Sequence, residues 1–168
     1  MVEYLVTKKG FSHYSARYFI LEEIKRRGLE QNRSMTREVA NELRKEHGPS
    51  YLMEQIYEMA KEEPKAVLES VRTIGEAEFL KSKGALLFAV DADRKLRYER
   101  IVARASELDH IDFDTFCAQE DVEMASSDPW DMNVFGVMQI SDARIENNGS
   151  LEELHQKVDE ALAKLAAQ

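Results

Sequence analysis

Two arginines with the spacing of an anion site follow a predicted buried strand. Residues Ala85–Val90 form a continuous apolar run, typical of a strand in a parallel sheet, and a charged segment with helical spacing follows. Arg100 and Arg104 lie four positions apart there, so their guanidinium groups share one helix face. Two adjacent guanidinium groups can bind phosphate oxygens and stabilise charge during phosphoryl transfer. The alternative is a solvated face paired with Glu99 and Glu107, and spacing alone favours it.

A further arginine follows another predicted strand. Arg72 comes directly after the apolar segment Ala66–Val71, and ligands of open α/β sheets bind beyond the carboxyl ends of the strands. Thr73 can cap the next helix or donate a hydrogen bond to a ligand. An ion pair of Arg72 with Glu76 is an equally good interpretation. Glu69 is either a buried carboxylate placed for a metal or substrate, or a side chain that points outward at the strand end.

These arginines come from two separate strand–helix units. Parallel strands end at the same edge of a sheet, so Arg72 emerges at the edge where the charged helix that carries Arg100 and Arg104 begins. We therefore expect Arg72, Arg100 and Arg104 to converge on one anion site.

Strands alternate with helices along the chain, which predicts an α/β fold with a parallel sheet covered on both faces. Expected strands are 11–15, 66–71, 85–90 and 143–146. Expected helices are 2–9, 16–27, 36–47, 50–63, 74–82, the charged segment ending at 104, 113–124, 133–140 and 150–166. Ser150 and Glu153 form a capping box at the start of the last helix.

Composition excludes several classes of protein. The 168 residues suit one domain spanning 1–168, and the net charge of −9 argues against binding to nucleic acid or to an anionic membrane surface. No apolar run reaches the roughly 20 residues of a membrane span. The single cysteine, Cys117, fits a reducing, cytoplasmic setting. The four histidines have no ligand spacing, so no metal site is expected.

The order of these segments resembles the P-loop nucleoside monophosphate kinases, the adenylate-kinase-like group that includes dephospho-CoA kinase. Arg72-Thr73 after AVLESV is similar to the arginine that binds the acceptor phosphate. The segment VDADRKLRYERIVAR is similar to the strand and helix that enter the lid, and DARIENNGSLEEL to the last strand, the loop near the donor base and the final helix.

The resemblance implies a three-layer parallel sheet with helices on both faces, with ATP and Mg²⁺ as cofactors and a small-molecule nucleotide as substrate. Residues 33–63 would be a helical acceptor-binding insertion, and 105–132 a lid-like segment. Arg100 and Arg104 would be catalytic. The implied acceptor-binding residues are Arg72, Thr73, Glu69, Ser15 and Arg17, although Ser15-Ala16-Arg17 stands where many members have Gly-Asp. The implied donor-binding residues are Asn147, Asn148 and Gly149.

The chain departs from this family at one place. The first predicted helix begins at Val2, and no G-x-x-x-x-G-K-[ST] phosphate loop occurs in the sequence. The central first strand is missing as well, which would leave strand edges unpaired unless another segment or chain, such as a second copy, fills the sheet. A non-catalytic nucleotide-binding or regulatory protein derived from such a kinase is therefore the alternative function.

The missing phosphate loop gives a first prediction. Because its backbone amides and lysine hold the donor phosphates, we expect negligible ATP-dependent phosphotransfer from the chain of 168 residues. A coupled assay over a panel of nucleoside monophosphates and dephospho-CoA measures it. Turnover near the roughly 1–100 s⁻¹ of kinases would contradict this expectation.

Overall fold

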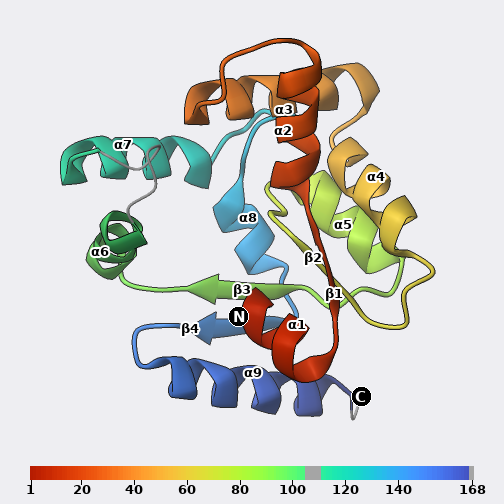
Figure 1. Cartoon of the computed structure of the whole chain (residues 1–168), viewed down its shortest axis with the longest axis vertical. Coiled ribbons are helices and arrows are strands. Elements are labelled where there is room, and N and C mark those ends of the chain that lie inside the picture. Colours follow the sequence, from red (N-terminus) through yellow and green to blue (C-terminus); the bar gives the residue numbers. More distant parts are fainter. Residues whose placement is uncertain (105–110, 167–168) are drawn as a thin grey trace.

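Helices and short parallel strands alternate in the computed structural model, which describes residues 1–104 and 111–166 (Figure 1). Its strands are β1 (Ser12–Ser15), β2 (Ala66–Glu69), β3 (Phe88–Asp91) and β4 (Ala143–Glu146). Its helices are α1 (Val2–Lys9), α2 (Ala16–Arg26), α3 (Arg33–His47), α4 (Tyr51–Ala60), α5 (Ile74–Ser82), α6 (Arg94–Arg104), α7 (Phe113–Met124), α8 (Val134–Gln139) and α9 (Leu151–Ala166). No helix in these two ranges is long and apolar enough to cross a membrane.

Local signals set most element boundaries. The α3 helix begins at Arg33, three residues before the predicted start, because the Asn32 side chain accepts a hydrogen bond from the Met35 N–H at 2.8 Å. The predicted capping box of α9 is confirmed, since the Ser150 N–H donates to Glu153 and the Glu153 N–H donates to the Ser150 hydroxyl. Caps of this kind satisfy amides that have no partner within the helix.

The second and third strands are shorter than predicted. The β2 strand ends at Glu69 because Ser70 adopts a φ of 71°, a left-handed conformation that no extended strand contains. The β3 strand begins at Phe88 rather than Ala85, and Leu86, which was predicted to be buried, is 51% exposed.

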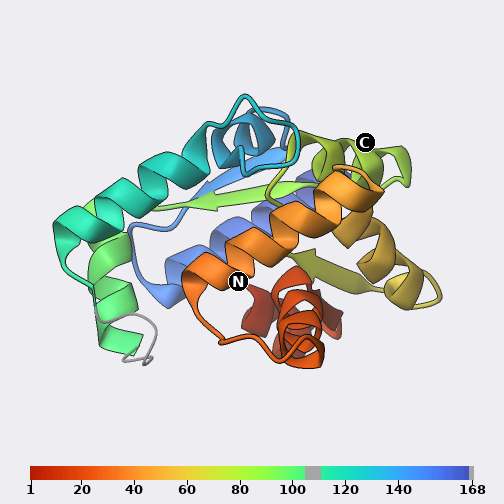
Figure 2. The ribbon, with the colours of Figure 1, turned by 90° about the horizontal axis from the view of Figure 1, so that it is seen from above.

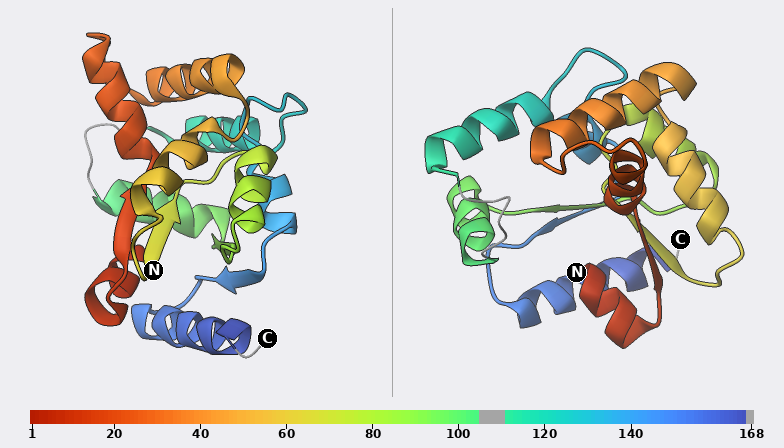
Figure 3. Two further views of the ribbon diagram at one scale, coloured as in Figure 1. Left: turned by 90° about the vertical axis from the view of Figure 1, so that its right-hand side faces the viewer. Right: turned by 45° about the horizontal axis from the view of Figure 1, so that its top comes forward.

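The strands form two separate sheets. β1 pairs with β2, placing Ser15 opposite Glu69, and β3 pairs with β4, placing Asp91 opposite Glu146. Both pairs are parallel, which confirms the predicted α/β class and strand direction. A single sheet with β2 beside β3 is not what the described residues form, and the two pairs run in different directions (Figures 1 and 3).

Helices pack on both faces of these sheets. On one face, α1 and α9 bury a cluster that includes Leu5, Ile145 and Val158, and Val67 of β2 and Phe88 of β3 both pack against it. On the other face, helices α4 and α5 cover β1 and β2 around Met53, Ile56 and Leu80, while α5 and α8 cover the start of β3 around Ala77, Leu87 and Val137. The two sheets therefore share one apolar layer without sharing a hydrogen-bonded ladder.

Among the described residues, one edge of β2 and one edge of β3 have no strand partner. The Ser12 N–H donates to the Lys65 carbonyl, and the Ala143 N–H donates to the Leu87 carbonyl. In a strand, the backbone amides of successive residues point to opposite edges. The amides of Leu68 and Val90 therefore point away from the paired strands. No backbone hydrogen bond joins β2 to β3 within 1–104 and 111–166, and Val90 is 38% exposed.

These edges predict a pattern of amide hydrogen exchange. Leu68 and Val90 should exchange faster than their neighbours Val67 and Ala89, whose amides point toward a paired strand. NMR-detected exchange measures all four amides in one sample. Equal protection of neighbouring amides would contradict open edges at β2 and β3.

Candidate functional site

The junction between β2 and α5 is fixed by a buried carboxylate. One oxygen of Glu76 accepts backbone N–H bonds from Arg72 at 2.7 Å and Thr73 at 3.2 Å. The Thr73 hydroxyl accepts from the Glu76 N–H and donates to the Pro49 carbonyl at 2.8 Å. Thr73 thus closes a capping box, the first of the two roles predicted for it. Its hydroxyl is committed to the backbone and buried.

The other oxygen of Glu76 binds a buried arginine. The Arg44 Nε and Nη2 atoms both lie 2.8 Å from Glu76 Oε1, and the two side chains are 1% and 0% exposed. A buried charge of either sign is costly unless it is paired and hydrogen-bonded, and here each compensates the other. Because Arg44 lies on α3, the pair attaches the predicted acceptor-binding insertion to the β2–α5 junction.

Further arginines extend this face of α3. Arg37 binds Asp131 through two hydrogen bonds, and Asn41 donates to the same carboxylate at 2.9 Å. Arg33 binds Glu123 of α7 at 2.7 Å. Positions 33, 37, 41 and 44 follow helical spacing, so α3 presents one polar stripe. Its first three residues bind α7 and the loop after it, and Arg44 binds Glu76 of α5.

This stripe changes the acidity of the Asp131 carboxyl. Burial raises its pKa, but hydrogen bonds from Arg37, Asn41 and the Met132 N–H outweigh that effect and lower the pKa from 3.8 to about 2. The carboxylate form of Asp131 is therefore strongly favoured in the folded protein.

Two hydrogen bonds hold the backbone of Arg72. Its N–H donates to Glu76, and its carbonyl accepts from the Asn133 N–H at 2.8 Å. Its side chain is half-buried and forms no ion pair with any other residue that the structure describes. The ion pair of Arg72 with Glu76, one of the two sequence interpretations, is absent because Glu76 binds the Arg44 guanidinium and the Arg72 backbone instead.

A second polar cluster lies at the carboxyl ends of β3 and β4. Arg97 of α6 binds Asp91 at 2.8 Å and Glu120 of α7 at 2.6 Å, and Arg144 of β4 binds Asp91 at 2.9 Å. The carboxylates that bind Arg94 and Arg97 thus come from β3 and α7. The alternative interpretation placed Glu99 and Glu107 beside Arg100 and Arg104, and it stays open because Glu107 and the Arg104 side chain lie outside the described part of the structure.

Arg100 belongs to this second cluster. Its guanidinium group donates to the carbonyls of Asn147 at 2.6 Å and Gly149 at 3.3 Å. The Asn148 side chain accepts from the Asp93 N–H at 2.8 Å. The predicted loop 147–149 is thereby attached to α6, with the backbone oxygens of Asn147 and Gly149 already engaged.

The structure brings together only part of the predicted site. Arg72 and Thr73 share one hydrogen-bond cluster, Arg100 and the 147–149 loop share another, and no hydrogen bond or ion pair between described residues joins the two. Arg104 ends α6, but its side chain lies outside the described part of the structure. The expected convergence of Arg72, Arg100 and Arg104 therefore stays a prediction.

The remaining predicted acceptor residues lie at the ends of β1 and β2. Ser15 is buried opposite Glu69, and Glu69 is half-exposed with its carboxylate 3.2 Å from His13 Nε2. Glu69 therefore takes the outward position of the two considered. Arg17 is exposed in the first turn of α2.

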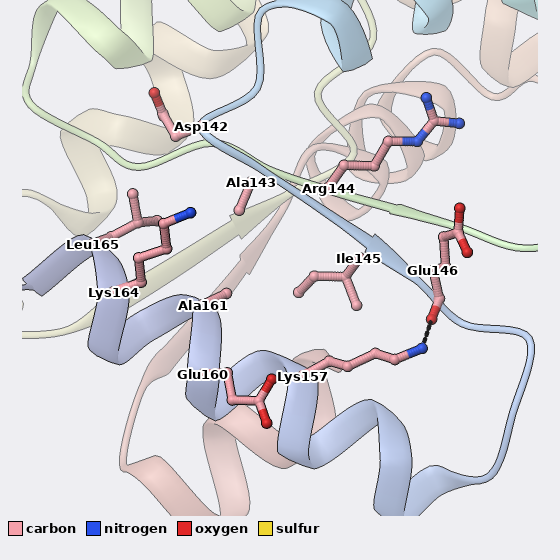
Figure 4. A pocket seen from close by; sticks show the side chains of 10 residues that line it. All are labelled: Asp142, Ala143, Arg144, Ile145, Glu146, Lys157, Glu160, Ala161, Lys164 and Leu165. Carbon is pink, nitrogen blue, oxygen red and sulfur yellow. Dashed lines mark hydrogen bonds between the residues drawn. The ribbon is translucent and has the colours of Figure 1, made fainter.

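Two cavities open at the β3–β4 sheet. The larger, about 620 Å³, lies between the outer edge of β4 and α9, where Lys157 donates to the Glu146 carbonyl at 2.8 Å (Figure 4). The smaller, about 170 Å³, is lined by Asp91, Asp93, Arg144 and neighbouring polar residues. Carboxylates equal the cations in the larger lining and outnumber them in the smaller one, so neither cavity favours an anion.

The residues present do not fit a nucleoside triphosphate with Mg²⁺. The sequence has no phosphate loop, and no cluster of three metal-ligating side chains occurs in the parts described. We therefore derive no phosphoryl-transfer step from this geometry.

Sequence reasoning missed the buried ion pair of Arg44 with Glu76, since it considered Glu76 only as a partner of Arg72. The Thr73-x-x-Glu76 pattern was an available signal for the capping box. Nothing local marks Arg44 as the partner of Glu76, because 32 positions separate them.

The buried pair predicts a large cost of neutralising Glu76. Glu76→Gln should lower the free energy of unfolding by about 3–5 kcal/mol, since it leaves the Arg44 charge buried and uncompensated. Denaturant unfolding measures the loss, and Glu78→Gln, on the exposed side of α5, is the matched control. Equal stability of the two variants would refute the role of the pair.

Asp131 predicts a specific pH dependence. Its folded pKa of about 2 lies below its ordinary value of 3.8, so its contribution to stability is full above about pH 4 and disappears as pH falls toward 2. The difference in unfolding free energy between wild type and Asp131→Asn should shrink over that window. A difference independent of pH between 2 and 6 would show that the Asp131 charge contributes nothing.

Comparisons with known proteins place the chain among archaeal relatives. No model of a known protein family matches it. It is 26% identical over 164 residues to a UPF0200 protein of Pyrobaculum aerophilum, covering 96% of this chain and 88% of that one. It is 29% identical over 154 residues to a UPF0200/UPF0201 protein of Archaeoglobus fulgidus, covering 88% of this chain but spanning only 46% of that protein. A UPF0200 protein of Aeropyrum pernix is 31% identical over 137 residues, with 80% of this chain and 70% of that one aligned. On this similarity, the chain belongs to the UPF0200 family.

Proposed function

We propose that this chain is a nucleotide-kinase-like protein of the P-loop nucleoside monophosphate kinase type. In its complete form it would transfer a phosphoryl group from ATP, with Mg²⁺, to a nucleoside monophosphate or a related small molecule in the cytoplasm. The observation that carries the proposal is the strand arrangement. In the part of the chain that the structure describes, two parallel pairs leave one edge of β2 and one edge of β3 without a strand partner, over one shared apolar cluster.

A fifth parallel strand between β2 and β3 completes the proposed fold. It would join the two small sheets into one three-layer sheet, because α1 and α9 already cover one face and α4, α5 and α8 the other. Such a strand would be apolar on both faces, like β2 and β3 themselves. Another segment or another chain, including a second copy, would supply it.

Arg72 is the proposed phosphate ligand for the acceptor. Its backbone is held on one side by Glu76 and on the other by Asn133, while its side chain has no ion-pair partner among the described residues. A fixed backbone with an uncommitted guanidinium group is suited to charge-assisted hydrogen bonds with phosphate. The α3–α4 insertion lies against this junction through Arg44.

Arg100 takes a positioning role in this proposal. Its hydrogen bonds to Asn147 and Gly149 hold the loop that the family resemblance assigns to the donor base. We therefore propose that Arg100 shapes the base site, and that Arg104 is the remaining candidate for contact with the transferred group.

A non-catalytic nucleotide-binding or regulatory protein is the second candidate. The observation that favours it is the absence of a glycine-rich phosphate loop from the 168 residues. Both candidates require an acceptor nucleotide at Arg72, and only the first requires phosphotransfer once the sheet is complete.

The acceptor site is tested by calorimetric titration with AMP and with inorganic phosphate. Arg72→Ala should weaken binding about 10- to 100-fold, since a charged hydrogen bond contributes about 1.5–3 kcal/mol. The matched control is Arg26→Ala, an exposed arginine of α2 paired with Glu23. Unchanged affinity of Arg72→Ala, with the same stability as wild type, would refute the acceptor site.

A further inference from the structure

Two ion pairs join the helical insertion to the segment that contains α7. Arg33 donates from Nε at 3.1 Å and from Nη2 at 2.7 Å to one oxygen of Glu123, which lies near the end of α7. Arg37 donates to both oxygens of Asp131, in the loop between α7 and α8. We call these two pairs the α3–α7 latch; both helices face the viewer in Figure 2.

The α6–α7 unit on the far side of the latch is held together independently. Arg97 binds Glu120 and Arg94 binds Asp121, each at 2.6 Å, and the rings of Tyr98, Phe113 and Phe116 pack with centroids 5.2–6.4 Å apart. The unit projects at the left of Figure 1, away from α4 and α5. Release of the latch can therefore separate α7 from α3 without disrupting the α6–α7 contacts.

The two carboxylates of the latch accept hydrogen bonds from guanidinium groups that could bind an anionic ligand instead. The fork of Arg37 meets Asp131 in the two-bond geometry that arginine also uses with phosphate. The four latch side chains are 18–36% exposed. Half-exposed pairs are individually weak and sensitive to salt, so a multiply charged anion can displace them.

We propose that the α3–α7 latch is an autoinhibitory contact, in which Glu123 and Asp131 occupy the α3 arginines and so prevent them from binding anionic ligands. The nature of the ligand rests on the function proposed above. The closed arrangement itself rests only on the contacts between α3, α7 and the following loop. An anion that binds Arg33 and Arg37 releases α7 from α3.

The test uses the full chain with both latch carboxylates neutralised, as Glu123→Gln/Asp131→Asn. Hydrogen exchange should become roughly tenfold faster in α7 and in residues 126–133, while α5 and α9 keep their rates. Apparent affinity for inorganic phosphate should rise several-fold. Glu58→Gln, which removes the exposed pair with Lys61, is the control.

Two results would overturn the latch. One is exchange that rises equally in all elements, which would indicate a general loss of stability. The other is phosphate affinity that does not rise above that of wild type. Failure of the acceptor site is separate, because it is judged by AMP binding to Arg72→Ala, a variant in which both latch pairs are intact.

Discussion

The contact between Arg44 and Glu76 is the interaction on which the arrangement at Arg72 depends. Glu76 uses one oxygen for a buried guanidinium group and the other for the backbone amides at the end of β2. A solvent-exposed carboxylate would hold these partners weakly, whereas a fully buried one must retain them, because leaving any of them unpaired is costly. The same residue thus caps α5, fixes the backbone of Arg72 and anchors α3.

A second constraint comes from the strands. A two-stranded sheet is marginally stable alone, and here two such pairs depend on shared helices for their burial. Val67 and Phe88 contact the same α1–α9 cluster, although their strands exchange no hydrogen bonds within the described ranges. Side-chain packing therefore holds the two strand pairs together, where the hydrogen bonds of a continuous sheet would ordinarily contribute. The unpaired edges at Leu68 and Val90 are the consequence.

Much of the fold could be predicted from periodicity and caps. The helices at 2–9, 74–82 and 113–124 and the strand at 143–146 have the predicted boundaries, because apolar spacing and capping residues are local signals. The missing central strand predicts unpaired strand edges, but which strands pair with one another could not be predicted, since strand pairing depends on contacts between distant segments. Ser70 ended β2 early through a backbone conformation that serine rarely adopts.

The candidate site shows the same division between local and distant information. The position of Arg72 after a strand and the capping role of Thr73 follow from neighbouring residues. The partners of Arg100, Arg97 and Glu76 do not, because they lie 47, 23 and 32 positions away. Charged residues with many possible partners leave no local pattern that identifies the one they bind.

The central claim is that an acceptor nucleotide binds at the β2–α5 junction. An NMR titration of ¹⁵N-labelled protein with AMP tests it most directly, because each backbone amide reports on its own surroundings. We expect the largest shift changes at Arg72, Thr73 and Asn133. Changes confined to the cavity between β4 and α9, or no saturable change at all, would contradict it.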